Sequence, residues 1–381
     1  MTITVRRLAA LAVALGAAGA ATPAIAAARG SGLPPFISQF TTTTTLASTV
    51  PAIGDQNPYG IVTAPRTIGC LQAGDILVSN FNDEGPTANG MPTTGGNQGE
   101  GTTIMQFNQD GSQPRLFAQL GSEEFAGGVG LTTALSALPD GYVIVGSLPT
   151  TDGTSATMTA GALIVLSPCG EVVGEIAGAP INGPWDMTSV TNGAITTLFV
   201  TNVLNGTVAA SPGTVDAGTG VRLRRFTGGS GRPRLLSVRT IAGGFAERTD
   251  PSALVVGPTG VGLSSGGTLY VADTVNSRIA AIPDAMTRMT ELGGGGMTVS
   301  SGEYLNAPLG LLIAPNGDIV SANGGDGNLV ETTPSGTQVA TNMIDDGNGT
   351  GAGDLFGIDL AAHDSGVLFV DDFDNTLRLL H

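Results

Sequence analysis

The sequence predicts an all-β fold, a closed ring of repeated units in which each unit is a small antiparallel sheet. Two observations support this prediction: a composition rich in turn-forming residues, and a strand pattern that recurs six times. Of the 381 residues, 59 are glycine and 22 are proline, and only 4% are aromatic. This composition is typical of short strands joined by turns, and the hydrophobic content of 41% is sufficient for a large buried core.

The clearest unit contains three short strands. An apolar strand over 258–263 starts at a proline, a second over 269–272 ends on Asp273, and a third over 279–282 returns. Five further stretches repeat this order, two closely and three with insertions: 308–331, 356–379, 58–80, 128–147 and 184–202. A repeat of roughly 40 to 70 residues with three or four strands has the size of a propeller blade. The sequence therefore predicts a six-bladed β-propeller over residues 56–381, and long meandering units fit the alternative, a solenoid, poorly.

The last unit ends at His381 with a third strand and no chain left for a fourth. An uncovered edge strand invites pairing with other chains, so something must cover it. Residues 36–50 include five consecutive threonines and favour extended structure. We therefore expect the N-terminal segment, 27–55, to supply the outer strand that closes the ring. The alternative for this segment is a flexible threonine-rich linker.

The clearest unit, PTGVGLSSGGTLYVADTVNSRIAAI, resembles the NHL repeat. That repeat starts at Pro-x-Gly-Ile, ends a strand on Leu-x-Val-Ala-Asp and returns through Asn-x-Arg-Ile; six copies form a six-bladed propeller. The resemblance implies a fold more specifically than an activity. The amidating-lyase and streptogramin-lyase propellers use histidines, and this chain has only His363 and His381. Calcium-dependent lactonases of the gluconolactonase type begin their first blade with Glu-Gly-Pro, which does not precede Tyr59.

The first residues predict a signal peptide over residues 1–26. Arg6 and Arg7 precede an apolar run, and Ala24 and Ala26 occupy the small-residue positions that a signal peptidase reads. The run is too short to anchor in a bilayer, so we expect an exported, soluble protein in the periplasm or outside the cell. A formal net charge of −16 repels phosphate, so nucleic acid and anionic membranes are poor candidate partners.

The two cysteines, Cys70 and Cys169, match no metal or redox motif. Cys70 falls in the turn after the first strand of blade one, and Cys169 in the turn after the third strand of blade two. These two kinds of turn share one face of a propeller, so we predict a disulfide between them, as suits an exported protein. Two unpaired thiols are the alternative.

Polar residues end the second strand of the units and mark the expected mouth of the channel. The candidate ligand-binding residues are this set together with two residues near the start of blade three: Asn80, Asn202, Asp273, Asn323, Asp372, Trp185 and Asp186. One interpretation is that the strand ends bond backbone amides. Another is a cation, Ca²⁺ being the candidate, near the channel. Trp185 either packs between blades or stacks on a ligand.

Long insertions separate the second and third strands of the first three units, over 81–102, 148–161 and 203–220. We expect them to form a wall over the channel mouth that brings acidic residues close to Trp185 and Asp186: Asp83, Glu84, Glu100, Asp152 and Asp216. The leading hypothesis is a binding or scaffold protein for an unidentified protein, small molecule or saccharide. The alternative is a divalent-metal-dependent hydrolase or lactonase. The absence of lysine excludes Schiff-base catalysis, and the sequence identifies no catalytic residue.

Overall fold

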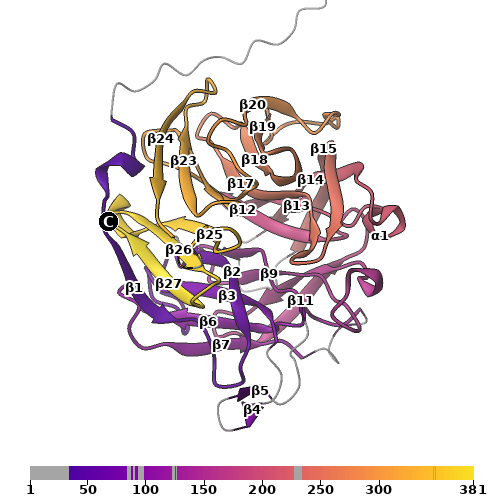
Figure 1. Ribbon diagram of the computed structural model, residues 1–381. Coiled ribbons are helices and arrows are strands. Elements are labelled where there is room, and N and C mark those ends of the chain that lie inside the picture. The colour runs from indigo at the N-terminus through magenta and orange to yellow at the C-terminus, as the bar shows by residue number, and fades with distance from the viewer. Residues whose placement is uncertain are drawn as a thin grey trace, which may run out of the picture.

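Figure 1 shows the computed structural model, in which six antiparallel sheets follow one another around a ring. The structure describes residues 34–83, 87–88, 91–92, 98–121, 125, 127–226, 234–345, 347 and 349–381. The predicted signal peptide, residues 1–26, and Glu84 lie outside this part of the chain. Among the described residues, none of the helices combines the length and the apolar character needed to cross a membrane.

The first three blades carry the long insertions. Blade one consists of β2 (Gln56–Thr63), β3 (Ile76–Asn82), β6 (Thr103–Phe107) and β7 (Arg115–Gln119), with a small hairpin of β4 (Thr87–Ala88) and β5 (Met91–Pro92). Blade two consists of β8 (Leu135–Ala137), β9 (Val143–Ser147), η3 (Ser155–Thr157), β10 (Ala162–Leu166) and β11 (Val172–Ala177). Blade three consists of β12 (Pro184–Asn192), β13 (Ile195–Asn202), α1 (Thr207–Ala210), β14 (Val215–Phe226), β15 (Arg234–Asp250) and β16 (Leu254–Val256).

The last three blades are more regular. Blade four consists of β17 (Pro258–Leu263), β18 (Leu269–Asp273), η4 (Thr274–Asn276), β19 (Arg278–Ile282) and β20 (Met297–Ser301). Blade five consists of β21 (Pro308–Ile313), β22 (Ile319–Asn323), β23 (Asn328–Thr332) and β24 (Gln338–Met343). Blade six consists of β25 (Leu355–Leu360), η5 (Ala362–Asp364), β26 (Val367–Asp371), β27 (Thr376–Leu380) and, from the other end of the chain, β1 (Thr43–Ser48).

The N-terminal segment closes the ring, as the sequence predicts. Strand β1 pairs antiparallel with β27, with Thr43 opposite Leu380, and Figure 1 shows β1 beside β27 and the C-terminus. The short helix η1 (Ile37–Gln39) precedes β1 and lies against blade five. The Glu331 carboxylate accepts the backbone N–H groups of Phe36 and Ile37, both at 2.8 Å. The side chains of Phe36 and Ile37 are buried, so this segment is part of the core.

In four of the blades, a glycine near the start of the inner strand sets how closely neighbouring blades approach. A Cβ atom added at Gly60, Gly260, Gly310 or Gly357 would lie 1.9, 2.1, 2.2 or 2.2 Å from a carbonyl oxygen of the next blade. No side chain fits at such distances, which explains why the Pro-x-Gly pattern repeats. Blade three carries Asp186 at this level instead, and its side chain enters the channel.

The inner strand of blade two differs from the sequence prediction. We expected it near 128–131, but the strand is β8 at Leu135–Ala137. The backbone at Gly128 and Leu131 has positive φ, 82° and 49°, so the chain turns there before the strand begins. This unit lacks the Pro-x-Gly pattern, and without it the alternation of apolar residues did not define the start of the strand.

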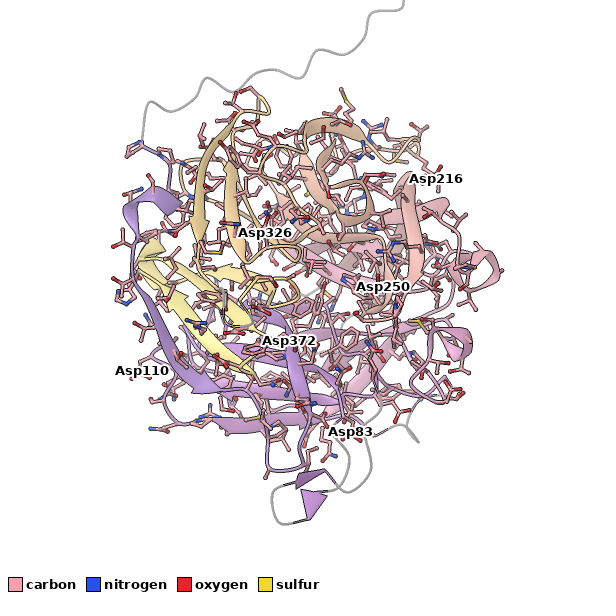
Figure 2. All side chains as sticks on the ribbon, viewed as in Figure 1. Asp83, Asp110, Asp216, Asp250, Asp326 and Asp372 are labelled. Carbon is pink, nitrogen blue, oxygen red and sulfur yellow. A yellow bond between two sulfur atoms is a disulfide. The ribbon has the colours of Figure 1, made fainter. Side chains whose placement is uncertain are left out.

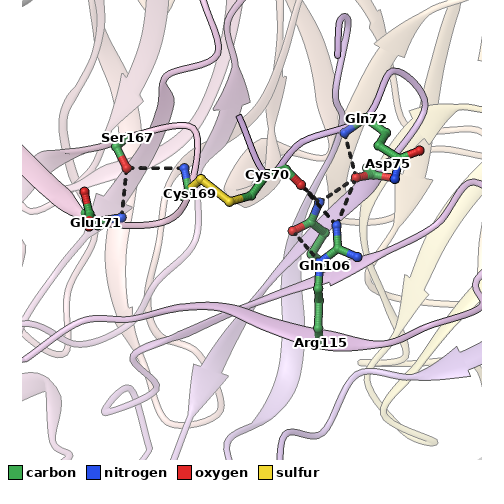
Figure 3. The surroundings of a disulfide bond; sticks show 8 residues. All are labelled: Cys70, Gln72, Asp75, Gln106, Arg115, Ser167, Cys169 and Glu171. Carbon is green, nitrogen blue, oxygen red and sulfur yellow. Dashed lines mark hydrogen bonds and ion pairs between the residues drawn. A yellow bond between two sulfur atoms is a disulfide. The ribbon is translucent and has the colours of Figure 1, made fainter. Parts of the chain in front are cut away.

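The disulfide between Cys70 and Cys169 is confirmed, with an S–S distance of 2.05 Å and a Cα–Cα distance of 4.8 Å. It joins the connection between β2 and β3 to the turn between β10 and β11 (Figure 3). The Arg115 guanidinium donates to the Cys70 carbonyl at 3.1 Å and pairs with Asp75 at 3.4 Å. Blades one and two are therefore cross-linked on the face where these turns meet.

Candidate functional site

Four aromatic side chains, Tyr59, Phe81, Trp185 and Phe356, meet near the mouth of the channel and are here named the aromatic plug. The Tyr59 ring lies 4.8 Å from that of Phe356 and 5.5 Å from that of Trp185, centroid to centroid. The Trp185 indole N–H donates a hydrogen bond to the Tyr59 hydroxyl. Blades one and three are not neighbours, so this contact spans the channel. The plug divides the channel into an upper pocket and a lower cavity.

The mouth pocket, as we name the upper space, has a volume of about 360 Å³. Phe81, Trp185 and Phe356 of the plug form its apolar side, while Arg248, Asp250 and Asp372 contribute charged groups. Nη1 of Arg248 lies 2.6 Å from Oδ2 of Asp250, which fixes the guanidinium. In Figure 2, Asp250 and Asp372 lie toward the centre of the ring, whereas Asp110 and Asp216 lie at its periphery.

A hairpin of β15 and β16 supplies Arg248 and Asp250, and sequence reasoning missed it. Strand β15 is 17 residues long, and its end pairs with β16, Arg248 opposite Val256. Only the Asp250–Pro251–Ser252 turn before the apolar stretch Leu254–Val256 could have signalled it. The insertions predicted to form the wall pack on this hairpin instead: Ser155 Oγ donates to the Leu254 carbonyl at 2.7 Å, and the Gln98 side chain donates to the Ser252 carbonyl.

Four of the predicted site residues, Asn80, Asn202, Asp273 and Asn323, are fully buried and bonded within the fold. The Asn80 amide donates to the Thr49 carbonyl at 3.1 Å, and the Asn323 amide donates to the Tyr304 carbonyl at 2.7 Å. Asp273 accepts from Nε of Arg278 at 2.6 Å. These contacts match the first interpretation of the strand ends, in which they satisfy backbone and neighbouring side-chain groups.

The other predicted site residues, Trp185, Asp186 and Asp372, line spaces in the channel. Trp185 is 1% exposed and packed in the plug. In blade six the strand β26 ends at Asp371, which pairs with Arg378 at 2.7 Å. Asp371 therefore takes the strand-end position, and Asp372 lies one residue further, in the mouth pocket.

Burial dominates the electrostatics of the acidic side chains near the mouth. It raises the pKa of Asp372 to about 7, with further increases from Asp371 and Asp354 and a decrease from the hydrogen bond of Asn57. It also raises the pKa of Glu247 to about 7, although Glu247 accepts the Asn205 N–H at 2.7 Å and the Thr207 hydroxyl at 2.9 Å. Across the part of the chain that the structure describes, no three His, Cys, Asp or Glu side chains are arranged to hold a metal ion.

These shifts predict a protein that is more stable in mild acid than in mild base. Burial raises the pKa of several carboxyl groups, to about 7 for Asp186, Glu247 and Asp372 and to about 6 for Asp318 and Asp371. Between about pH 4 and pH 7 the folded chain then binds more protons than the unfolded chain, so the free energy of unfolding falls as pH rises.

Calorimetry should give a melting temperature about 5 °C or more higher at pH 5 than at pH 8. The difference should persist in high salt, since buried groups are poorly screened. Equal melting temperatures at the two pH values would contradict the raised pKa values of these buried carboxyl groups.

The sequence matches no family profile and no curated protein, but solved structures resemble the fold. A gluconolactonase from Xanthomonas campestris is 14% identical with a TM-score of 0.52, over 91% of this chain and 94% of that one. The calcium-binding protein regucalcin from Agrobacterium tumefaciens is 13% identical with a TM-score of 0.51, over 88% and 93%. A luciferin-regenerating enzyme is 11% identical with a TM-score of 0.51, over 89% and 95%. What this chain shares with these proteins, at such low identity, is the six-bladed β-propeller fold.

Proposed function

We propose that the protein is an exported binding protein of the NHL type and that the mouth pocket is its ligand site. The observation that carries the proposal is the pocket itself, where charged groups face an aromatic surface on a ring of rigid sheets. Its volume of about 360 Å³ falls in the range of small-molecule sites, roughly 300 to 1,000 Å³. The signal peptide expected over residues 1–26 supports export.

The chemistry of the lining favours a small polar ligand with one apolar face, such as a mono- or disaccharide. Phe356 and Phe81 offer apolar surface, while Arg248, Asp372 and Asn57 offer donors and acceptors. This combination of a flat apolar wall and convergent polar groups is what orients small polar ligands. Because Asp250 already holds the guanidinium, Arg248 loses little conformational freedom when a ligand binds.

A divalent-metal-dependent lactonase is the second candidate, supported by the fold likeness to the gluconolactonase. Such an enzyme would need oxygen ligands for a cation near the mouth. In the mouth pocket, the side-chain oxygens of Asp372 and Asn57 are the candidate ligands for such a cation. Asp250 is a poorer candidate, because it already forms a salt bridge with Arg248.

Titration calorimetry against a panel of saccharides, combined with a lactone-hydrolysis assay with and without calcium, tests both candidates. For a saccharide that binds, we expect Arg248→Ala and Phe356→Ala each to weaken binding at least about ten-fold. Arg234→Ala, on an exposed outer-strand position, is the matched control and should bind as the parent does. Calcium-dependent lactone turnover that is lost in Asp372→Asn would favour the second candidate and overturn the first.

A further inference from the structure

Below the plug, the channel widens into a lower cavity of about 500 Å³ that is lined by the inner strands of all six blades. Two carboxylates enter it, Asp186 from β12 and Asp359 from β25. These strands belong to blades three and six, which are opposite in a ring of six, so the two carboxylates enter the cavity from opposite sides. Asp359 lies two positions further along its inner strand than Asp186 does, and so at a different depth of the channel. The partly exposed side chains of Leu263 and Leu360 line the same cavity.

Backbone N–H groups hold both carboxylates in place. Asp186 accepts from Met187 at 2.8 Å and from Val261 in the next blade at 3.1 Å. Asp359 accepts in the same manner, from Leu360 at 2.8 Å and from Thr63 in the next blade at 2.7 Å. A carboxylate has about four acceptor sites. The backbone bonds use two on each group and the Thr63 side chain also interacts with Asp359, so each group can still accept from a ligand.

No positive charge balances these two acids inside the cavity. Its lining includes no arginine or histidine among the described residues, and consists otherwise of aliphatic side chains, hydroxyl groups and one glycine. Burial and the nearby charge of Asp359 raise the pKa of Asp186 to about 7. An unpaired carboxylate in such surroundings is costly, and a bound cation would offset that cost.

We propose that the lower cavity binds a small aliphatic primary amine, with its ammonium group between Asp186 and Asp359 and its carbon chain along the aliphatic lining. An ammonium group donates three hydrogen bonds and needs few ligands. A hard divalent cation, by contrast, takes six or more oxygens, and the lining supplies mostly aliphatic surface. The site is separate from the mouth pocket, because the aromatic plug lies between them.

Titration calorimetry with n-hexylamine at pH 8 tests the site, and hexan-1-ol is the matched neutral probe. We expect the amine to bind at least about ten-fold more tightly than the alcohol, since only the amine offsets the carboxylate charge. Calcium chloride should not bind at this site, so its heat of titration should be the same for the parent and for Asp359→Asn. Equal binding of amine and alcohol, or a calcium heat that Asp359→Asn abolishes, would overturn the proposal.

Three variants separate binding from a structural role of the acids. Asp359→Asn should weaken the binding of the amine at least about ten-fold. Thr188→Lys leaves both carboxylates and their hydrogen bonds intact but places an ammonium group in the cavity, so it should abolish amine binding in a folded protein. Arg248→Ala, in the mouth pocket, should bind the amine with the same affinity as the parent. The test of the lower cavity is therefore independent of the proposed function of the mouth pocket. Unaltered binding by folded Thr188→Lys would refute the site.

The pH profile supplies a readout that packing alone would not move. The titratable groups that act on Asp186 are Asp359, opposite, and Tyr59, whose pKa burial raises far from neutrality. The amine needs Asp186 ionised, so its affinity should be about ten-fold lower at pH 6 than at pH 8. A flat profile over this interval would count against the proposal.

Discussion

A chain that begins at Val50 is expected to lose at least about 5 kcal/mol of stability, because the ring can no longer close. The truncation removes β1 and leaves β27 as an unpaired edge. It also removes the buried side chains of Phe36 and Ile37, each worth about 2 to 3 kcal/mol of burial. Glu331, which is fully buried, would lose the two backbone N–H groups that it accepts and keep the Asn316 amide at 2.7 Å, and a buried carboxylate with fewer donors adds to the loss.

Urea unfolding followed by circular dichroism measures this loss, and size-exclusion chromatography detects association through the free edge of β27. Glu331→Gln keeps the strand but removes the charge and replaces one of the two accepting oxygens by an NH2 group, so it should cost about 1 to 3 kcal/mol. Thr44→Ala alters an exposed side chain of β1 without removing backbone pairing and should change stability little. A truncated chain that stays monomeric with an unchanged unfolding midpoint would show that β1 is dispensable.

Much of the fold follows from local patterns in the sequence, because each blade repeats them. The Pro-x-Gly start of the inner strand is visible at three of the glycines where neighbouring blades meet, Gly60, Gly260 and Gly310, while Gly357 follows Leu355 in place of the proline. Ring closure followed from counting strands in the last unit. The inner strand of blade two and the β15–β16 hairpin were not predictable in this way. The first has no Pro-x-Gly pattern, and the second extends a strand beyond the length that the other units share.

Less of the candidate site than of the fold could be predicted from the sequence. Polar residues at strand ends looked like ligand-binding groups, but Asn80 and Asp273 are occupied within their own surroundings. The mouth pocket and the lower cavity exist because Tyr59, Trp185 and Phe356 meet across the channel. Those residues come from blades one, three and six and share one position of the repeat, the residue just before Gly60, Asp186 or Gly357. The repeat alone did not show that their side chains meet across the channel. Asp186 was identified from its position near the start of blade three. Its partner Asp359 was not identified from the sequence.

Replacement of both cysteines by serine is expected to lower the free energy of unfolding by about 4 kcal/mol while the folded structure is retained. The disulfide joins residues 99 positions apart, and closing a loop of about 100 residues stabilises by about 4.7 kcal/mol in the chain-entropy model. The fold should survive because a hydrogen bond also joins the two turns, from the Cys70 N–H to the Pro168 carbonyl at 3.2 Å. Within blade one, Arg115 donates to the Cys70 carbonyl and holds that turn in place.

Chemical denaturation of the oxidised parent, the reduced parent and the Cys70→Ser/Cys169→Ser variant separates the cross-link from the side chains. The reduced parent and the variant should unfold at the same urea concentration, both well below the oxidised parent, because each lacks only the constraint on the unfolded chain. Arg115→Ala in the oxidised parent is the control for local contacts and should cost no more than about 1 to 2 kcal/mol. If the variant matched the oxidised parent, the unfolded chain would have to be compact enough for the cross-link to remove no freedom, and stability would reside in the blade contacts alone.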